Sequence, residues 1–116
     1  MHELSIALSI LDIVEEEAER LGATRVTAVH LKIGLLSGIV PEALQSAFDL
    51  IKEGTSFAAA QLVIQELPII INCPTCAAER PIESIQNFIC QTCSTPCNDV
   101  VSGRQLEVSA LEIEAS

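Results

Sequence analysis

Two CxxC pairs constrain this chain more than any other feature of its sequence. Residues 73–76 read CPTC, residues 90–93 read CQTC, and a fifth cysteine follows at Cys97. Two such pairs at this spacing are typical of metal knuckles that close one tetrahedral site with four thiolates, the geometry that zinc prefers. We therefore expect a structural zinc site. Its expected ligands are Cys73, Cys76, Cys90 and Cys93.

Two other uses of these cysteines remain open at this point. A dithiol redox centre of the thioredoxin type needs a helix directly behind the CxxC, and Pro81 discourages an early helix after Cys76. Iron in a tetrathiolate would make an electron-transfer site, and ligand spacing is the same for iron and zinc. Cys97 is surplus to a four-ligand site, so it is either a free thiol or a substitute for Cys93.

Charge limits the partners of this 116-residue chain. Sixteen acidic residues against six basic ones give a formal net charge of -10, which repels phosphate backbones and anionic lipid surfaces. No apolar run approaches the roughly 20 residues of a membrane span, and the start lacks the cationic region of a signal peptide. We expect a soluble cytoplasmic protein with reduced cysteines that binds neither nucleic acid nor membranes.

Hydrophobic periodicity predicts both helices and strands. Because 49% of the residues are hydrophobic and only 3% are aromatic, the core must be aliphatic. Apolar residues spaced by three and four positions predict a helix over 4–21, and Pro41 suits the first position of a second helix that Gly54 ends. Alternating apolar residues predict strands over 25–34, over 60–67 with a break at Pro68, and over 104–115.

These elements predict an α+β fold with two helices packed on a small β-sheet. The cysteine segment shows little periodicity and few core residues, so we expect it to be a four-cysteine, zinc-ribbon-like module inserted before the last strand. The expected boundaries are 1–71 plus 99–116 for a discontinuous first domain and 72–98 for the zinc-binding module.

The chain opens MHELSIAL, with a histidine directly behind the initiating amine. The amine of Met1, the deprotonated amide of the second residue and the His2 imidazole form fused chelate rings around one metal. Such a planar nitrogen set favours Ni(II) or Cu(II) over tetrahedral zinc. Glu3 would supply the fourth ligand through its amide or its carboxylate. The ordinary alternative for His2 is a solvated tail residue.

Several segments, in order along the chain, resemble the HypA/HybF family of hydrogenase nickel-incorporation proteins. They are MHELSIALSILDIVEEEA, VHLKIGLLSGIVPEAL, FDLIKEGTSFAAAQLVIQELP, the two CxxC pairs and GRQLEVSALEIE. The resemblance implies that Met1, His2 and Glu3 bind nickel and that the four cysteines of the pairs bind a structural zinc. It also implies two partners, the GTPase HypB and the [NiFe]-hydrogenase large-subunit precursor.

Two positions depart from the pattern of this family. A glycine commonly follows each knuckle in zinc ribbons of this kind, and Ala77 and Ser94 stand there instead, so we expect less regular knuckles. Elsewhere, His30 lies on the outer face of its predicted strand and is expected to be an ordinary surface histidine.

The sequence is therefore interpreted as a nickel metallochaperone that delivers Ni(II) for maturation of a [NiFe]-hydrogenase. We do not expect an enzyme, because nothing pairs a nucleophile with a base and no glycine loop suits a phosphate. The alternative is a zinc-ribbon protein-interaction module without a labile metal site, in which the opening MHE only begins a helix.

Overall fold

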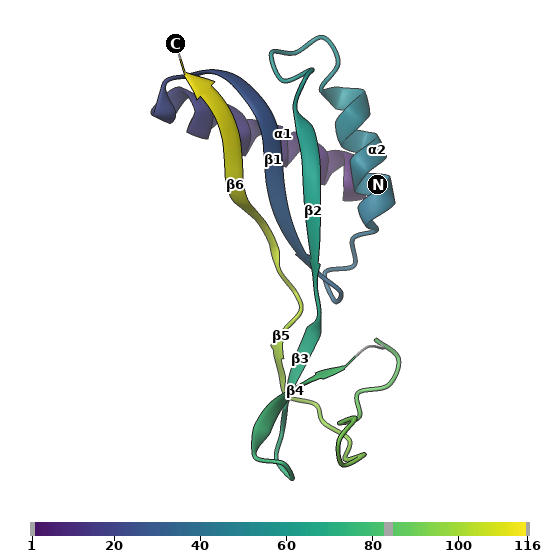
Figure 1. Ribbon diagram of the computed structural model, residues 1–116. Helices are drawn as coiled ribbons and strands as arrows, with labels where there is room; N and C mark the ends of the chain where they lie inside the picture. Colours follow the sequence, from purple (N-terminus) through teal and green to yellow (C-terminus); the bar gives the residue numbers. More distant parts are fainter. Residues whose placement is uncertain (1, 83–84, 116) are drawn as a thin grey trace. The chain divides into compact units, whose positions relative to one another are not determined.

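The computed structural model describes residues 2–82 and 85–115, and the fold is α+β as predicted. Two three-stranded sheets form, one in the strand order β2-β1-β6 and the other in the order β4-β3-β5 (Figure 1). The elements in chain order are α1 (His2–Leu21), β1 (Ala23–Gly34), α2 (Pro41–Ile51), β2 (Gln61–Leu67), β3 (Ile69–Cys73), β4 (Ala78–Ile82), β5 (Val100–Ser102) and β6 (Leu106–Ala115). No helix among the described residues is long and apolar enough to cross a membrane.

The chain divides into two compact units. The first contains residues 1–31, 39–65 and 107–116, and the second contains residues 32–38 and 66–106. The second unit is therefore larger than the predicted 72–98 module, since strands on both sides of the cysteine segment belong to it. The functional boundaries 1–71 plus 99–116 and 72–98 stay a prediction.

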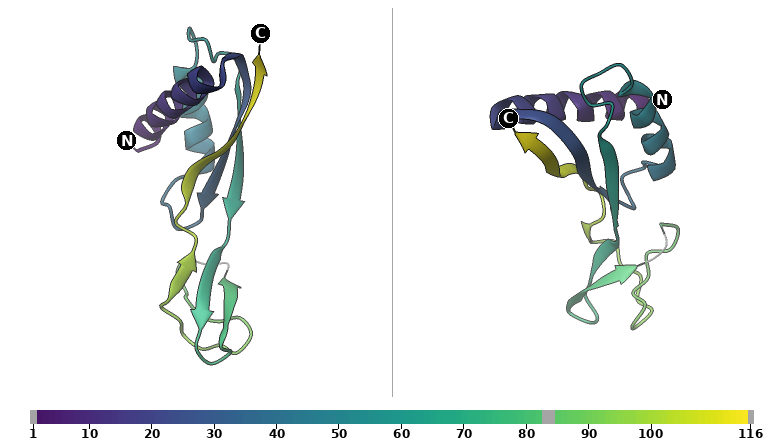
Figure 2. Two further views of the ribbon diagram at one scale, coloured as in Figure 1. Left: turned by 90° about the vertical axis from the view of Figure 1, so that its left-hand side faces the viewer. Right: turned by 45° about the horizontal axis from the view of Figure 1, so that its top comes forward.

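In the first unit, both helices lie on one face of the sheet, and the other face is open (Figure 2). The buried side chains of α1 recur every three or four residues, so they form one stripe that faces the sheet. They are Ala7, Ile10, Val14 and Ala18. Val29 and Leu31 of β1 are buried as the alternation predicts. Gly22, at φ 66°, ends α1 in the left-handed conformation that glycine adopts most easily.

Helix α2 begins at Pro41, as predicted, and packs against α1. Leu44 and Phe48 are fully buried, one helical turn apart. The amine of Lys52 donates to the Ala60 carbonyl over 2.7 Å and lies 5.8 Å from the centre of the Phe48 ring. This lysine therefore links the end of α2 to the start of β2 by a hydrogen bond.

Strand β6 returns to the first sheet, as predicted, and its neighbour there is β1. The hydroxyl of Thr27 donates to the Glu112 carbonyl over 3.1 Å, and His30 Nε2 lies 2.7 Å from Glu112 Oε2. The predicted surface histidine thus has a cross-strand partner. Val108 and Leu111 are both half-buried, so the inward side of β6 changes phase between them.

The second unit is built around β3, which pairs antiparallel with β4 and with β5. Residues at the end of β1 also belong to it: the Leu36 N–H donates to the Gly103 carbonyl over 2.7 Å. A Cβ atom on Gly34 would collide with that same carbonyl, so only glycine fits there. The sequence analysis did not predict β4 or β5, which are five and three residues long.

Candidate metal centre

Four of the five cysteines gather into one cluster in the second unit. Their sulfur atoms all lie within 4.8 Å of one another, and they belong to Cys73, Cys76, Cys90 and Cys93. The Cys73 and Cys93 sulfurs are 3.5 Å apart, and the Cys76 and Cys90 sulfurs are 3.8 Å apart. A tetrahedron with metal–sulfur bonds of about 2.3 Å has edges of about 3.8 Å. The cluster therefore has the size of a tetrathiolate metal site.

The first pair of ligands comes from the β3–β4 hairpin. Cys73 is the last residue of β3, opposite Ala78 at the start of β4. The Cys76 N–H points back to the Cys73 sulfur over 3.4 Å, and Ala77 then takes a φ of 53°. An N–H directed at a thiolate stabilises its negative charge, which is the arrangement that a metal-bound sulfur needs.

The second pair lies on a loop in which the residue behind the knuckle is again left-handed. The Ser94 N–H donates to the Cys90 carbonyl over 2.7 Å, the Cys90 N–H donates to the Thr95 carbonyl over 2.9 Å, and Ser94 has a φ of 62°. Both positions behind the knuckles thus adopt the left-handed conformation that glycine would supply. Ala77 and Ser94 accept this conformation at a cost of about 1–2 kcal/mol each, so the departure from glycine does not change the backbone conformation at these two positions.

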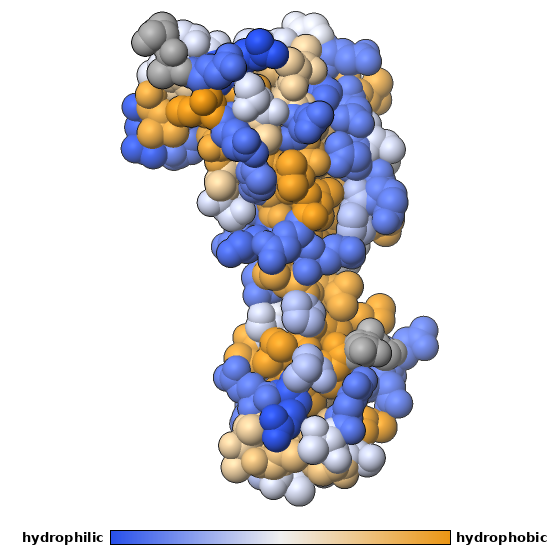
Figure 3. Space-filling view, viewed as in Figure 1, coloured by the Kyte–Doolittle hydropathy of each residue, from blue (hydrophilic) through white to orange (hydrophobic). Residues whose placement is uncertain are grey.

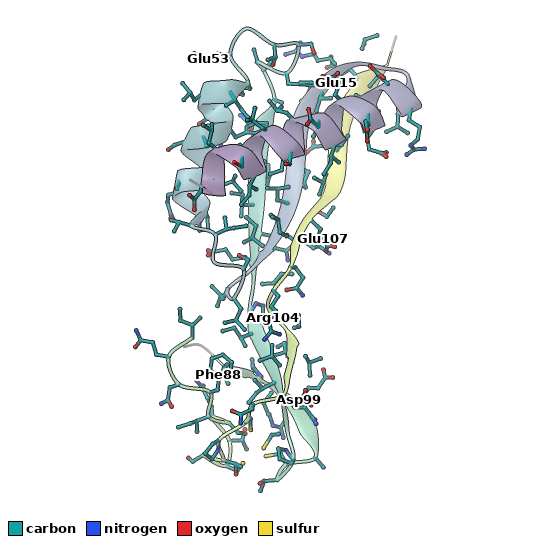
Figure 4. The ribbon with its side chains drawn as sticks, turned by 180° about the vertical axis from the view of Figure 1, so that it is seen from behind. Glu15, Glu53, Phe88, Asp99, Arg104 and Glu107 are labelled. Carbon is teal, nitrogen blue, oxygen red and sulfur yellow. The ribbon has the colours of Figure 1, made fainter. Side chains whose placement is uncertain are left out.

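Hydrophobic side chains surround the four sulfurs. Cys73 and Cys90 are fully buried, and Cys76 and Cys93 are half-buried. Ile71 and Ile82 are buried in the same cluster, and Phe88 packs against it. Figure 4 shows the sulfur atoms gathered in this unit, together with the labelled Phe88. Since thiolates bind metal tightly where water is excluded, the donor set and its surroundings fit a structural metal ion.

The thiols of the cluster differ in acidity. The hydroxyl of Thr95, followed by its backbone N–H, lowers the pKa of Cys93 to about 6. Hydrogen bonding with Cys93, followed by burial, raises the pKa of Cys76 to about 12. Cys93 therefore loses its proton more easily than Cys76, and a divalent cation would favour loss of the Cys76 proton, because only thiolates ligate metal.

Arg80 on β4 is the cation beside this cluster. A hydrogen bond from its side chain acts on Cys76 and lowers the pKa of that thiol, against the larger effects that raise it. Among the described residues, its Nε is the buried side-chain nitrogen that has no hydrogen-bond partner. Four thiolates around a divalent ion carry a net charge of about -2, so a guanidinium here offsets part of that charge. The sequence analysis did not identify this role, since a lone arginine in a loop-rich segment carries no signal.

Cys97 lies outside the four-sulfur set. It is 2% exposed, and its thiol donates to the Thr95 carbonyl over 3.2 Å. Burial raises the pKa of this thiol, which keeps it protonated and unreactive. Because Cys93 itself completes the cluster, the structure favours the free-thiol interpretation of Cys97 over the substitute ligand.

The predicted nickel ligands lie where α1 begins. The helix starts at His2, and Glu3, in its first turn, is half-exposed. Met1 and the side chain of His2 lie outside what the structure describes, so the nickel site stays a prediction. The first few N–H groups of any helix lack acceptors within the helix, so the amides near His2 are not committed to the helix.

Known proteins resemble this chain over nearly its whole length. Residues 1–113 match the family described as hydrogenase/urease nickel incorporation, metallochaperone, hypA. The hydrogenase maturation factor HypA of Chloroflexus aurantiacus is 46% identical over 112 residues, which cover 97% of this chain and 98% of the relative. That of a Roseiflexus species is 43% identical over 114 residues, covering 98% and 93%.

Solved structures show the same fold. The solution structure of the Ni metallochaperone HypA from Helicobacter pylori covers 100% of both chains with a TM-score of 0.68 and 24% identity. A second solution structure of a HypA protein gives a TM-score of 0.71, also at 24% identity, and covers 100% of this chain and 98% of the other. Taken with the family match and the identity to the two curated relatives, this shows that the chain belongs to the HypA family of hydrogenase/urease nickel-incorporation metallochaperones.

Proposed function

We propose that this chain binds Ni(II) at its N-terminus through Met1, His2 and Glu3 and delivers it for maturation of a [NiFe]-hydrogenase. The observation that carries the proposal is the start of α1 at His2, in a chain that belongs to a nickel-incorporation family. The amine, the amides and the imidazole then lie within consecutive residues. A site at the end of the chain needs no buried cage, which suits delivery better than storage.

The chemistry of this chain end supports Ni(II) as the cargo. Amine, deprotonated amide and imidazole nitrogens form a planar donor set, which Ni(II) accepts and zinc does not prefer. Loss of an amide proton near His2 breaks no intrahelical hydrogen bond, because the first N–H groups of α1 have no acceptor in the helix. The negative charge that develops there is also stabilised by the positive end of the helix dipole.

The four-cysteine cluster serves a different purpose in this proposal. We assign it zinc, which has no redox chemistry and prefers four thiolates in a tetrahedron. When bound, the ion supplies cross-linking and folding energy to the second unit. Cys73 and Cys76 hold it from the β3–β4 hairpin, and Cys90 and Cys93 hold it from the following loop. Nickel and zinc thus occupy separate sites, one labile and one structural.

The partners follow from the family. We propose that the chain works in the cytoplasm with the GTPase HypB and with the large-subunit precursor of the hydrogenase. Its formal charge of -10 favours encounter with basic protein surfaces and disfavours nucleic acid and anionic membranes.

Calorimetric titration of Ni(II) into the zinc-loaded protein with an untagged N-terminus tests the nickel site. We expect one stoichiometric site that is lost in His2→Ala and in a version extended by one residue at the start. His30→Ala is the matched control, since it removes the other histidine and should leave binding unchanged. Unchanged binding in both N-terminal variants would refute amine and imidazole ligation.

The second candidate function is a zinc-ribbon protein-interaction module without a labile metal. The fully formed cysteine cluster supports it, since that cluster needs no nickel to build its unit. A His2→Ala variant that still supports hydrogenase maturation in cells would favour this candidate. Loss of maturation, with partner binding retained, would favour nickel delivery.

A further inference from the structure

Strand β6 forms one edge of the first sheet. The strand order is β2-β1-β6, so among the described residues β6 pairs on one side only, with β1. Residues 107–114 of β6 belong to the first unit and include no proline and no lysine. Alternate N–H and C=O groups of such an edge point away from the sheet and can pair with an added strand.

An apolar groove runs along this edge. Ile13, Glu17 and Leu21 of α1 line one side of it, and Val108 to Leu111 of β6 line the other, around a cavity of about 300 Å³. The three helix residues are four positions apart and therefore share one face of α1. Ile13 and Leu21 are 44% and 45% exposed. An added strand could cover both side chains.

The opposite face of β6 is acidic. Glu107, Glu112 and Glu114 are exposed, and they alternate with the half-buried Val108, Leu111 and Ile113. Figure 3, which looks onto the open face of the sheet, shows hydrophilic side chains over the region of β6, with hydrophobic ones among them. His30 contacts Glu112, while the salt bridges found among the described side chains bring no cation to Glu107 or Glu114.

These charges argue against a second copy of the chain as the occupant. Two antiparallel β6 strands would bring the same three carboxylates of each copy onto one face of the joint sheet. Like charges on neighbouring strands destabilise the pairing. The carboxylates of one copy would therefore repel those of the other, whereas lysine or arginine at those positions would pair with them.

We propose that the β6 edge docks an extended segment of a partner protein in which apolar residues alternate with Lys or Arg. Because side chains of a strand point alternately to its two faces, the apolar set covers Ile13 and Leu21. The basic set lies on the open face beside Glu107 and Glu114. This surface needs no metal, so it goes beyond the proposed nickel function and is tested separately from it.

The probe is a peptide blocked at both ends with the sequence Lys-Val-Arg-Ile-Lys-Val-Arg, titrated into the zinc-loaded full chain. We expect NMR shift changes and slowed amide exchange at alternate residues of 107–114. A scrambled peptide of the same composition should bind at least about tenfold more weakly, since it loses the alternation. Ile13→Asp should weaken binding about tenfold, and Leu8→Asp, a 50% exposed position on α1 away from the groove, should not.

A double variant tests the contacts of the acidic residues separately from those of the groove. Glu107→Lys combined with Glu114→Lys should lower affinity for the basic peptide and raise it for the version with Glu in place of Lys and Arg. Circular dichroism checks that each variant folds. Equal binding of the scrambled peptide, or shifts that avoid β6, would overturn the proposal. The proposal would also be overturned if sedimentation showed dimers and the β6 amides exchanged slowly without peptide. In that case a second copy of the chain would occupy the edge.

Discussion

The sulfur atoms of Cys73 and Cys93 lie 3.5 Å apart, although 20 positions separate the two residues in sequence. One ends β3 and the other belongs to a loop with little regular structure, apart from an isolated bridge between Ile89 and Pro96. This contact therefore joins the hairpin to the loop. The rest of the local core is small, so the geometry of the second unit depends on a metal ion bound by these sulfurs.

Removal of the metal should unfold the cysteine loop while the first unit stays folded. Metal binding contributes folding free energy where a small segment has too few apolar residues, and the first unit has its own buried core. After chelation, NMR should show loss of dispersed signals for 85–99 and retention of those for α1, α2 and β1. Cys73→Ser should reproduce this result. Cys97→Ala, the control, should keep one zinc per chain, and loss of zinc there would contradict the free-thiol interpretation.

Arg80 should slow metal release by its charge. Arg80→Gln removes the guanidinium beside Cys76. A charge-assisted hydrogen bond is stronger than a neutral one, but solvent weakens it at this half-exposed side chain. Zinc transfer to a chromogenic chelator should therefore be faster, by at most about fivefold. Arg80→Lys should recover part of the effect, and Arg104→Gln serves as the control. Equal rates of zinc release from the unchanged protein and the three variants would show that Arg80 has no role at the cluster.

The sequence predicted the parts of the fold that repeat a local pattern. Stripes at helical spacing located α1 and α2, and Pro41 and Pro68 marked where elements begin or end. Strands β4 and β5 were missed because β4 contains Pro81 and β5 has only three residues. Both exist because β3 offers them hydrogen bonds on its two sides, which is a tertiary effect without a local signal.

The candidate metal centre was predictable because CxxC spacing reports ligand geometry directly. The backbone behind the knuckles was not, since Ala and Ser give no sign of a left-handed φ. Arg80 and Thr95 were not predictable either. Their effect on the thiols depends on distances set by the register of β4 and by the loop after Cys90.

The ion pair between Glu17 and Arg20 on α1 makes a contribution to stability that depends on pH. Their side chains are 2.7 Å apart, and the hydrogen bond from Arg20 lowers the pKa of Glu17 below its ordinary 4.5. A carboxyl with a lowered pKa stabilises the fold above its ordinary pKa, and this contribution is lost as pH falls through the lowered value. NMR titration should find the Glu17 pKa below 4.5 and restored in Arg20→Gln. A Glu17 pKa that is the same in both proteins would contradict the pairing.

Glycine behind each knuckle should stabilise the zinc-loaded protein. Ala77 and Ser94 have φ values of 53° and 62°, where an L side chain costs about 1–2 kcal/mol and glycine costs nothing. Part of the gain is lost because glycine makes the unfolded chain more flexible, so we expect about 0.5–1 kcal/mol for each of Ala77→Gly and Ser94→Gly. Urea unfolding measures the change. The matched control is Ala78→Gly, one residue further on in β4, which should destabilise by about 0.5–1 kcal/mol because glycine weakens a strand. Destabilisation by Ala77→Gly of the same size as by Ala78→Gly would show that the left-handed turn carries no strain.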